Sequence, residues 1–327
     1  MRRSVRCRGS KAGALPQPSL LMMLLTVQVL NGVQLGLLLF LIAAGLTLVF
    51  GVMDFINLAH GVQYMLGAYL GVMFATLTGS FWAGLVLASI TAGAVGLVLE
   101  FLVFRHLYAS SHLDQVLATF GIILTLNEGV RMLWGAAPLQ MPMPDALSGS
   151  FQLMDGLRYP VYRVFLIVAG LVVAGALAWA VNRTRAGMLI RAGASNAAMV
   201  NALGVDIGRL FTLVFAIGAM LAGFAGVLAA PLVSVEPSMG DNLLILAFIV
   251  IVIGGVGAIR GAFVAALLVG LTDTLGRTLV TDAARAVLGA SAAARVGPAA
   301  ASMLVCLVMA LVLAIRPAGL FGTARAA

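Results

Sequence analysis

The stretch DFINLAHGVQYMLGAY, from Asp54 to Tyr69, decides how this chain folds, because it places polar side chains between two long apolar runs. Upstream lies LGLLLFLIAAGLTLVFG, and downstream lies LGVMFATLTGSFWAGLVLASI. If the stretch were helical, with about 100° of rotation per residue, Asp54, Asn57, His60 and Tyr64 would cluster on one side. Polar groups at membrane depth are costly unless they face a cavity, water or one another.

Two interpretations of this stretch remain open. Gly51 and Gly61 bracket it, so it is either a break between two half-helices that lines a transport pathway, or an interfacial turn between the first two spans. Catalysis is disfavoured, because His60 has no nucleophile motif and no metal-binding pattern beside it, and we expect neither a metal nor another cofactor. The pathway candidates are Asp54, Asn57, His60, Gln63 and Tyr64.

The composition indicates a membrane protein. Of the 327 residues, 62% are hydrophobic and only 9% are charged. Soluble domains carry about 25% charged residues. The net charge of +8 does not indicate nucleic-acid binding, because the arginines lie scattered between apolar runs, where they act as topology signals.

The recurring apolar runs predict an all-α polytopic membrane protein, a bundle of about eight or nine transmembrane helices with one or more broken helices. The predicted spans 243–259 and 261–277 are separated only by Arg260 and glycines, so they form either two short spans or a broken hairpin. The candidate spans are 26–51, 61–79, 82–104, 115–134, 161–181, 210–232, 243–259, 261–277 and 298–315.

Two polar segments indicate the orientation. Residues 135–160 hold four prolines and predict an irregular external loop, whereas residues 182–209 carry four arginines and predict a cytoplasmic loop. Within the second segment, SNAAMVNAL predicts a short helix capped by Ser195 and stopped by Gly204.

The predicted domain organisation is a polar basic tail (1–19), a single transmembrane domain (20–322) and a short tail (323–327). This orientation places the N-terminus outside, against the positive-inside rule. We therefore expect translation to begin at Met22 or Met23.

Three acidic residues fall in or near the predicted spans: Glu100, Glu128 and Asp273. A charge at a helix centre costs on the order of 2.5–3.5 kcal/mol, so we expect these side chains to face the bundle. Glu128 and Arg131 are spaced to pair on one helix. Buried carboxylates of this kind keep open a second function class, a stand-alone secondary transporter driven by an ion.

The chain cannot form its own P-loop ATPase site. A P-loop needs a lysine after its glycines, and the only lysine is Lys11, close to the N-terminus. GGVGAIRG at 254–261 has the wrong spacing for a nucleotide-binding turn and follows an apolar run. We therefore expect a protein that is not an enzyme and that depends on other chains for any ATP hydrolysis.

Several segments together resemble one family, the permease subunits of branched-chain amino-acid ABC importers, the LivH type. One segment alone would be weak evidence for a family, but the five segments follow one another in the order of that family and cover nearly the whole chain. They are NGVQLGLLLFLIAAGLTLVFGVMDFINLAHGVQYMLGAY (31–69), TRAGMLIRA (184–192) with ALGVDIGRL (202–210), FAIGAMLAGFAGVL (215–228), VIGGVGAIRGAFVAALLVGLTDTL (252–275) and RPAGLFG (316–322).

The resemblance implies a subunit of the bacterial inner membrane that works with a second permease subunit, two cytosolic ATP-binding subunits and a periplasmic substrate-binding protein. It also implies alternating access, with urea and short amides as alternative substrates within the same family. The loop 182–209 would hold the helix that couples the permease to an ATPase. The implied coupling residues are Arg185, Arg191, Ala197, Val200, Asn201, Leu203 and Gly204.

Overall fold

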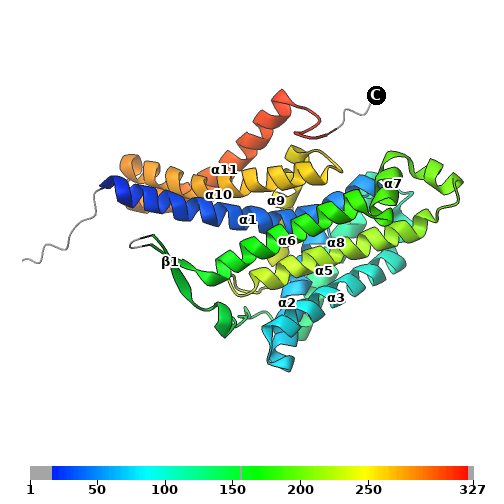
Figure 1. Cartoon of the computed structure of the whole chain (residues 1–327), viewed down its shortest axis with the longest axis horizontal. Helices are drawn as coiled ribbons and strands as arrows, with labels where there is room; N and C mark the ends of the chain where they lie inside the picture. The colour runs from blue at the N-terminus through cyan, green and yellow to red at the C-terminus, as the bar shows by residue number, and fades with distance from the viewer. Residues whose placement is uncertain (1–16, 155–156, 323–327) are drawn as a thin grey trace, which may run out of the picture.

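The computed structural model describes residues 17–154 and 157–322, and these form a bundle of long helices with one small hairpin (Figure 1). The polar tail predicted at 1–19 lies mostly outside the described residues, as does 323–327. The helices are α1 (Gln17–Met53), α2 (His60–Thr78), α3 (Phe81–Leu99), the π-helix η1 (Glu100–Phe104), α4 (Arg105–Leu107), α5 (His112–Trp134), the 3-10 helix η2 (Asp145–Leu147), α6 (Val161–Arg183), α7 (Arg185–Ala202), α8 (Ile207–Ala229), α9 (Met239–Gly254), α10 (Ile259–Leu288) and α11 (Ala290–Ile315). The strands are β1 (Ser150–Met154) and β2 (Leu157–Pro160).

The polytopic all-α prediction is confirmed, and each predicted span overlaps a described helix, with the span 82–104 covering both α3 and η1. Seven of the described helices are long and apolar enough to cross a membrane. Neither α2 nor α9 is among the seven; α9 is apolar but has only 16 residues. The apolar run 243–277, which the sequence predicts as two short spans or a broken hairpin, contains two separate helices. Helix α9 ends at Gly254 and α10 begins at Ile259.

Some predicted boundaries were wrong. The helix α10 runs to Leu288, well past the predicted end at 277, and α11 begins at 290 instead of 298. Helix α10 continues past the apolar run with polar and charged residues that hydropathy discounts. The predicted irregular loop also contains the antiparallel hairpin of β1 and β2, in which Phe151 pairs with Tyr159.

The two ends of the bundle differ in charge. We call the end that carries α7 and the arginines Arg183, Arg185, Arg191 and Arg209 the arginine-rich end. The hairpin and the turn between α10 and α11 lie at the opposite end (Figure 1). The positive-inside rule predicts that the arginine-rich end faces the cytoplasm.

Backbone contacts between small residues hold α1 against α10. A Cβ atom built on Gly36 would lie 2.8 Å from the carbonyl oxygen of Ala266, and one on Gly270 would lie 2.4 Å from the nitrogen of Gly36. Real side chains do not fit at such distances. Close approach through small residues is the main packing device between helices in lipid, where the hydrophobic effect does not drive them together.

The chain turns back into the bundle after α1. The segment 54–59 is not helical, and Phe55, Asn57 and Ala59 within it are fully buried. His60, at the start of α2, contacts the carbonyl of Ile42, although α1 continues to Met53, roughly 16 Å further at 1.5 Å per residue. The segment therefore re-enters from the arginine-rich end, and α2 begins near the middle of the bundle.

The start of α9 lies at the same place, approached from the opposite end. After α8, the segment 230–238 forms a bridge between Val235 and Leu139 and then leads into α9. A Cβ on Gly61 would lie 2.7 Å from the carbonyl oxygen of Gly240, so the first turns of α2 and α9 touch through glycine. From this meeting point the two helices run towards opposite ends of the bundle.

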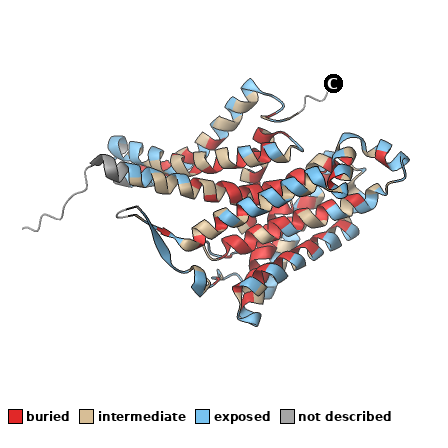
Figure 2. Cartoon of the chain, in the orientation of Figure 1, coloured by how far each residue is buried: buried red, intermediate tan, exposed pale blue. Residues whose placement is uncertain are grey.

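Buried residues of several helices gather around this meeting point (Figure 2). On the arginine-rich side, Phe55 of the re-entrant segment contacts Phe104, with 5.4 Å between ring centroids, and Phe104 contacts Phe215 of α8 at 4.9 Å. The backbone N–H of Ile56 donates to Oε1 of buried Gln115, at 3.2 Å. These contacts fix the segment between η1, α5 and α8.

Candidate functional site

The first candidate site is a polar cluster inside the bundle, formed by Asn57, His60 and Gln63, which we call the central cluster. Asn57 and His60 are fully buried, and Gln63 is 1% exposed. The His60 ring lies against α1, where a Cβ on Gly45 would be 3.0 Å from Cε1. Gln63 faces α3, where a Cβ on Gly96 would be 3.6 Å from Nε2. The cluster therefore lies where α1, α2 and α3 meet.

Most hydrogen-bonding atoms of the central cluster have no ordinary partner. Nε2 of His60 donates to the carbonyl oxygen of Ile42 at 3.1 Å, which leaves Nδ1 as an acceptor. The Gln63 amide lies beside the His60 ring, but neither Nδ1 nor the amide atoms make a hydrogen bond of normal geometry. Both amide atoms of Asn57 are likewise unpaired. Buried polar groups usually have partners, so this concentration of exceptions calls for an explanation.

The structure does not bring together all the predicted pathway residues. Tyr64 is buried near the cluster, one turn after His60, whereas Asp54 is exposed and lies at a positive φ of 52°. The prediction that these residues share one helical face is wrong, because residues 54–59 are not helical. Asp54 therefore lies near the entrance of the re-entrant segment and the other four residues lie inside.

Sequence patterns missed two polar residues near the meeting point. The Asn127 side chain is buried, and its Nδ2 donates to Oγ of Ser238 at 3.2 Å, while its Oδ1 is unpaired. Ser238 directly precedes α9 and has a φ of 69°. The left-handed backbone of a serine before an apolar helix is a local signal that single-sequence analysis does not show.

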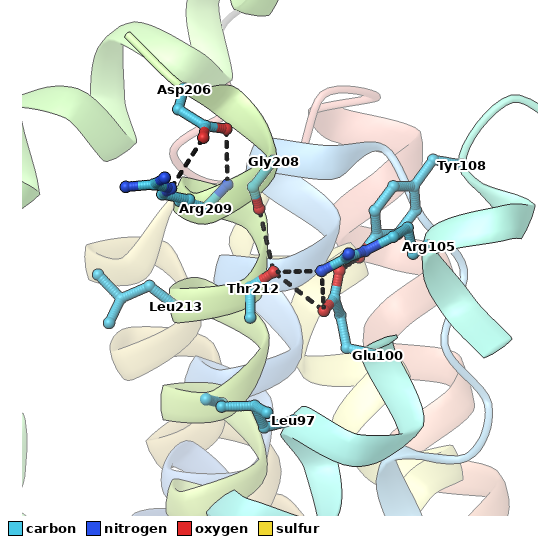
Figure 3. Close-up of a pocket in the computed structure, with 10 residues that line it drawn as sticks. Leu97, Glu100, Arg105, Tyr108, Asp206, Gly208, Arg209, Thr212 and Leu213 are labelled. Carbon is cyan, nitrogen blue, oxygen red and sulfur yellow. Dashed lines mark hydrogen bonds and ion pairs between the residues drawn. The ribbon is translucent and has the colours of Figure 1, made fainter. Parts of the chain in front are cut away.

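A second polar cluster lies at the arginine-rich end, where η1 meets α8 (Figure 3). We call Glu100, Arg105, Tyr108 and Thr212 the Glu100 cluster. Tyr108 donates to Oε1 of Glu100 at 2.8 Å, and Thr212 donates to Oε2 at 2.9 Å. The Arg105 guanidinium lies 3.4 Å from the same Oε2. Burial, together with the hydrogen bond to Glu100, raises the pKa of Tyr108, so its hydroxyl keeps the donated proton.

The other predicted buried charges behave differently from each other. Asp273 is buried and binds Arg277 through two hydrogen bonds of 2.8 and 2.9 Å. Glu128 pairs with Arg131 at 3.0 Å, but its side chain is 59% exposed. The prediction that Glu128 faces the bundle is therefore wrong. It lies near the end of α5, which packs loosely and leaves that face open.

Helix α7 carries the predicted coupling residues, and its kink corrects their arrangement. Asn196 has non-helical φ and ψ, and its Oδ1 accepts the N–H of Met199 at 2.9 Å, so Asn196 and not Ser195 caps the second half of the helix. The stop at Gly204 has the expected positive φ of 86°. Val200 is only 6% exposed, whereas Leu203 is 76% exposed.

The remaining coupling candidates lie on the surface of α7. Ala197 is half-buried, and Arg185, Arg191 and Asn201 are exposed. The Arg191 guanidinium donates to the carbonyl oxygen of Val181 in α6, which ties the two helices together. Val200 and Leu203 do not share a face, since the Val200 side chain packs inward and the Leu203 side chain is exposed.

No group of three or more His, Cys, Asp or Glu side chains in residues 17–154 and 157–322 is arranged to hold a metal ion. The arrangement instead offers buried hydrogen-bonding atoms where two helices begin, inside a bundle built for a lipid environment. Such a fold and site define a multi-pass membrane protein of the transport class.

The comparisons with known proteins narrow this class to a family. Residues 28–313 match the family model described as branched-chain amino acid transport system / permease component. The chain is 30% identical over 269 residues to the high-affinity branched-chain amino acid transport system permease protein BraD of Pseudomonas aeruginosa, which covers 78% of this chain and 87% of that protein.

Two further relatives extend the comparison. Over 270 residues the chain is 31% identical to the permease protein LivH of Escherichia coli K12, covering 76% of this chain and 84% of that one. Over 170 residues it is 30% identical to the autoinducer 2 import system permease protein LsrC of Klebsiella pneumoniae, covering 50% and 48%. No solved structure matches the chain. The chain belongs to the family of branched-chain amino acid transport permease components.

Proposed function

We propose that this chain is the permease subunit of an ABC importer that moves branched-chain or related small amino acids across a bacterial inner membrane by alternating access. The family and the printed names of the relatives support the substrate class. The observation that carries the proposal is the central cluster, whose unpaired polar atoms lie where α2 and α9 begin. Discontinuous helices at this depth are typical of pathways in transporters.

In this proposal Asn57, His60 and Gln63 line the pathway in at least one state, with Tyr64 beside them and Asp54 near its cytoplasmic mouth. An amino acid passing through brings its own ammonium and carboxylate groups, which need hydrogen bonds once water is stripped away. Unpaired amide and imidazole atoms supply such bonds without a fixed charge, so they release the substrate again easily.

Energy comes from partner chains in this proposal. The partners are a second permease subunit, two cytosolic ATP-binding subunits and a periplasmic substrate-binding protein. Helix α7 presents Met199 and Leu203, one helical turn apart and both exposed, at the arginine-rich end. An exposed apolar pair on a short helix fits a groove on an ATPase, in the manner of other helix-in-groove contacts. Arg185 and Arg191 flank that contact.

The rival function, a secondary transporter driven by an ion, loses its main support from the geometry of the carboxylates. An ion-coupled site needs a buried carboxylate that is free to bind the ion. Glu100 is engaged by three donors, and Asp273 is held by Arg277. Neither carboxylate is available without breaking an ion pair.

Uptake by a reconstituted complex tests the function. The chain is expressed with two ATPase subunits and a second permease subunit, and the complex is placed in proteoliposomes with a substrate-binding protein. We expect ATP-dependent uptake of labelled leucine or valine that stops when the binding protein is left out. Uptake of urea or acetamide in place of amino acids would shift the substrate class, and ion-driven uptake without ATPase subunits would contradict the proposal.

Paired substitutions on α7 test the coupling role. Leu203→Asp is expected to leave the chain folded, because the side chain is exposed, but to remove substrate-stimulated ATP hydrolysis. Val200→Asp buries a charge and is expected to lower the amount of folded protein instead. The measurements are ATP hydrolysis by the complex and recovery of the purified chain. Wild-type stimulation with Leu203→Asp would exclude this face of α7 as the contact.

A further inference from the structure

A pocket of about 690 Å³ opens beside the Glu100 cluster, between the end of α3 and the start of α8 (Figure 3). Its volume lies within the range of pockets that bind drug-sized molecules, roughly 300–1,000 Å³, and far exceeds the needs of a single ion. Neither the central cluster nor α7 uses it. The side chains that line the pocket indicate which kind of ligand it binds.

Both walls of the pocket change from charged to apolar in the same direction. On α8, Asp206 and Arg209 lie at the helix start, and Leu213 and Ala216 follow deeper in the bundle, so this wall extends roughly 15 Å at 1.5 Å per residue. On the other wall, Arg105 lies at the end and Leu97 lies deeper. This gradient matches the boundary between lipid headgroups and acyl chains.

Two arginines and two carboxylates line the pocket as two ion pairs, and in each pair the arginine is the more exposed partner. Glu100 is 1% exposed, and its three donors already engage it. The side chain of Arg105 is 44% exposed, with its guanidinium 4.5 Å from the ring centroid of Phe101, and that of Arg209 is 89% exposed. One exposed carboxylate, Asp206, pairs with Arg209 at 2.9 Å.

The rim of the pocket below these charges is apolar and open. Leu97 and Leu213 line the pocket and are both more than two-fifths exposed, and Phe101 and Leu102 beside them are more exposed still. In a membrane-spanning bundle such side chains meet acyl chains. A ligand seated in the pocket can therefore keep its polar end at the charged lip and its apolar end in the bilayer.

We propose that this pocket binds one phospholipid of the leaflet at the arginine-rich end. The two guanidiniums hold the phosphate, since arginine forms strong, charge-assisted hydrogen bonds with phosphate oxygens. Asp206 accepts a hydrogen bond from the headgroup, which favours an ethanolamine over a choline. The first carbons of the acyl chains lie along Leu97 and Leu213, so the lipid fills the gap between α3 and α8.

Native mass spectrometry of the full chain, purified with its copurifying subunits and stripped of lipid, tests the proposal with added phosphatidylethanolamine. Arg209→Gln is expected to weaken lipid binding about tenfold, as befits the loss of a charge-assisted phosphate contact. Arg285→Gln is the matched control, because Arg285 forms an exposed pair with Asp282 at the opposite end and should bind lipid as the wild type does. Leu213→Gln should weaken binding without altering any charge.

Four outcomes would overturn the proposal. The first is wild-type lipid binding by both Arg209→Gln and Leu213→Gln, and the second is equal weakening by Arg285→Gln. The third is complete displacement of the lipid by inorganic phosphate at equal concentration, which would make the pocket a phosphate site. The fourth is loss of the lipid when a second permease subunit is bound, which would show that a protein covers the pocket. Equal binding of phosphatidylcholine would remove the headgroup role of Asp206.

Discussion

The central cluster and the Glu100 cluster both bury polar side chains, but they differ in how those side chains are paired. Around Glu100, three donors meet one carboxylate. In the central cluster, Asn57 and Gln63 have no normal hydrogen bond, and His60 has one. A buried polar group without a partner costs free energy, so a sequence retains such groups where they meet something other than their own chain. One cluster joins helices through its hydrogen bonds, whereas the other keeps buried hydrogen-bonding atoms that the chain itself does not pair.

The strongest test of this contrast removes the carboxylate that joins η1 to α8. Glu100→Ala leaves Thr212 and Tyr108 without their acceptor and should lower the free energy of unfolding by about 3 kcal/mol. Thermal or denaturant unfolding of the purified chain in detergent measures the change. Unfolding at the wild-type midpoint would show that the cluster contributes nothing to stability.

The opposite result is expected in the central cluster. Asn57→Leu replaces an unpaired amide with an apolar group of similar size, so stability should stay within about 1 kcal/mol of the wild type or rise. Uptake by the reconstituted complex should fall about tenfold or more, as for the loss of one good hydrogen bond to the passing substrate. Unchanged uptake together with lost stability would mean that Asn57 serves the fold.

A single donor to Glu100 gives a finer comparison. Thr212→Val keeps the shape of the side chain and removes only the hydroxyl that bonds Oε2, so a loss of about 1 kcal/mol is expected. The same unfolding assay applies, with Thr125→Val as the control, since the Thr125 hydroxyl bonds only the Gly121 carbonyl of its own helix in an exposed position. Equal losses in the two variants would deny the cluster any special role.

The smallest effect is expected at the exposed pair. Glu128→Gln removes the ion pair with Arg131, but an exposed pair contributes little, so the change in unfolding free energy should stay below about 0.5 kcal/mol. Unfolding at low and at high salt completes the measurement. A loss as large as that of Glu100→Ala would show that burial does not separate the two glutamates.

Hydropathy predicted the all-α membrane fold, because long apolar runs form the helices that cross a bilayer. Two of the nine predicted spans, however, became α2 and α9, which are not among the seven described helices that are long and apolar enough to cross. Hydropathy could not place Glu128, since sequence spacing gives the pairing with Arg131 but not which face of α5 the bundle covers. The prediction that Asp54 and His60 share a helical face was wrong for a different reason. The segment between them is not helical, and the contacts that hold it in place, such as Gln115 to Ile56, come from distant parts of the chain.

The Glu100 cluster was foreseen only in part. The sequence offers Arg105 near the end of the same span, but Thr212 lies in another helix and no local pattern links it to Glu100. The meeting of α2 and α9 depends likewise on close contact between Gly61 and Gly240, two glycines among the chain's 38. Long-range pairings of this kind require the tertiary structure.

The shared starting point of α2 and α9 also has a consequence for how the chain enters the membrane. Neither helix is among the seven described helices that are long and apolar enough to cross a bilayer alone. Each follows a helix that is among the seven, since α1 precedes α2 and α8 precedes α9. We therefore expect these helices to insert as two pairs, in which the first helix enters by its own hydropathy and carries in the second. A ribosome that stalls between α1 and α2 leaves an anchored chain, whereas deletion of α1 leaves α2 without the helix that carries it in.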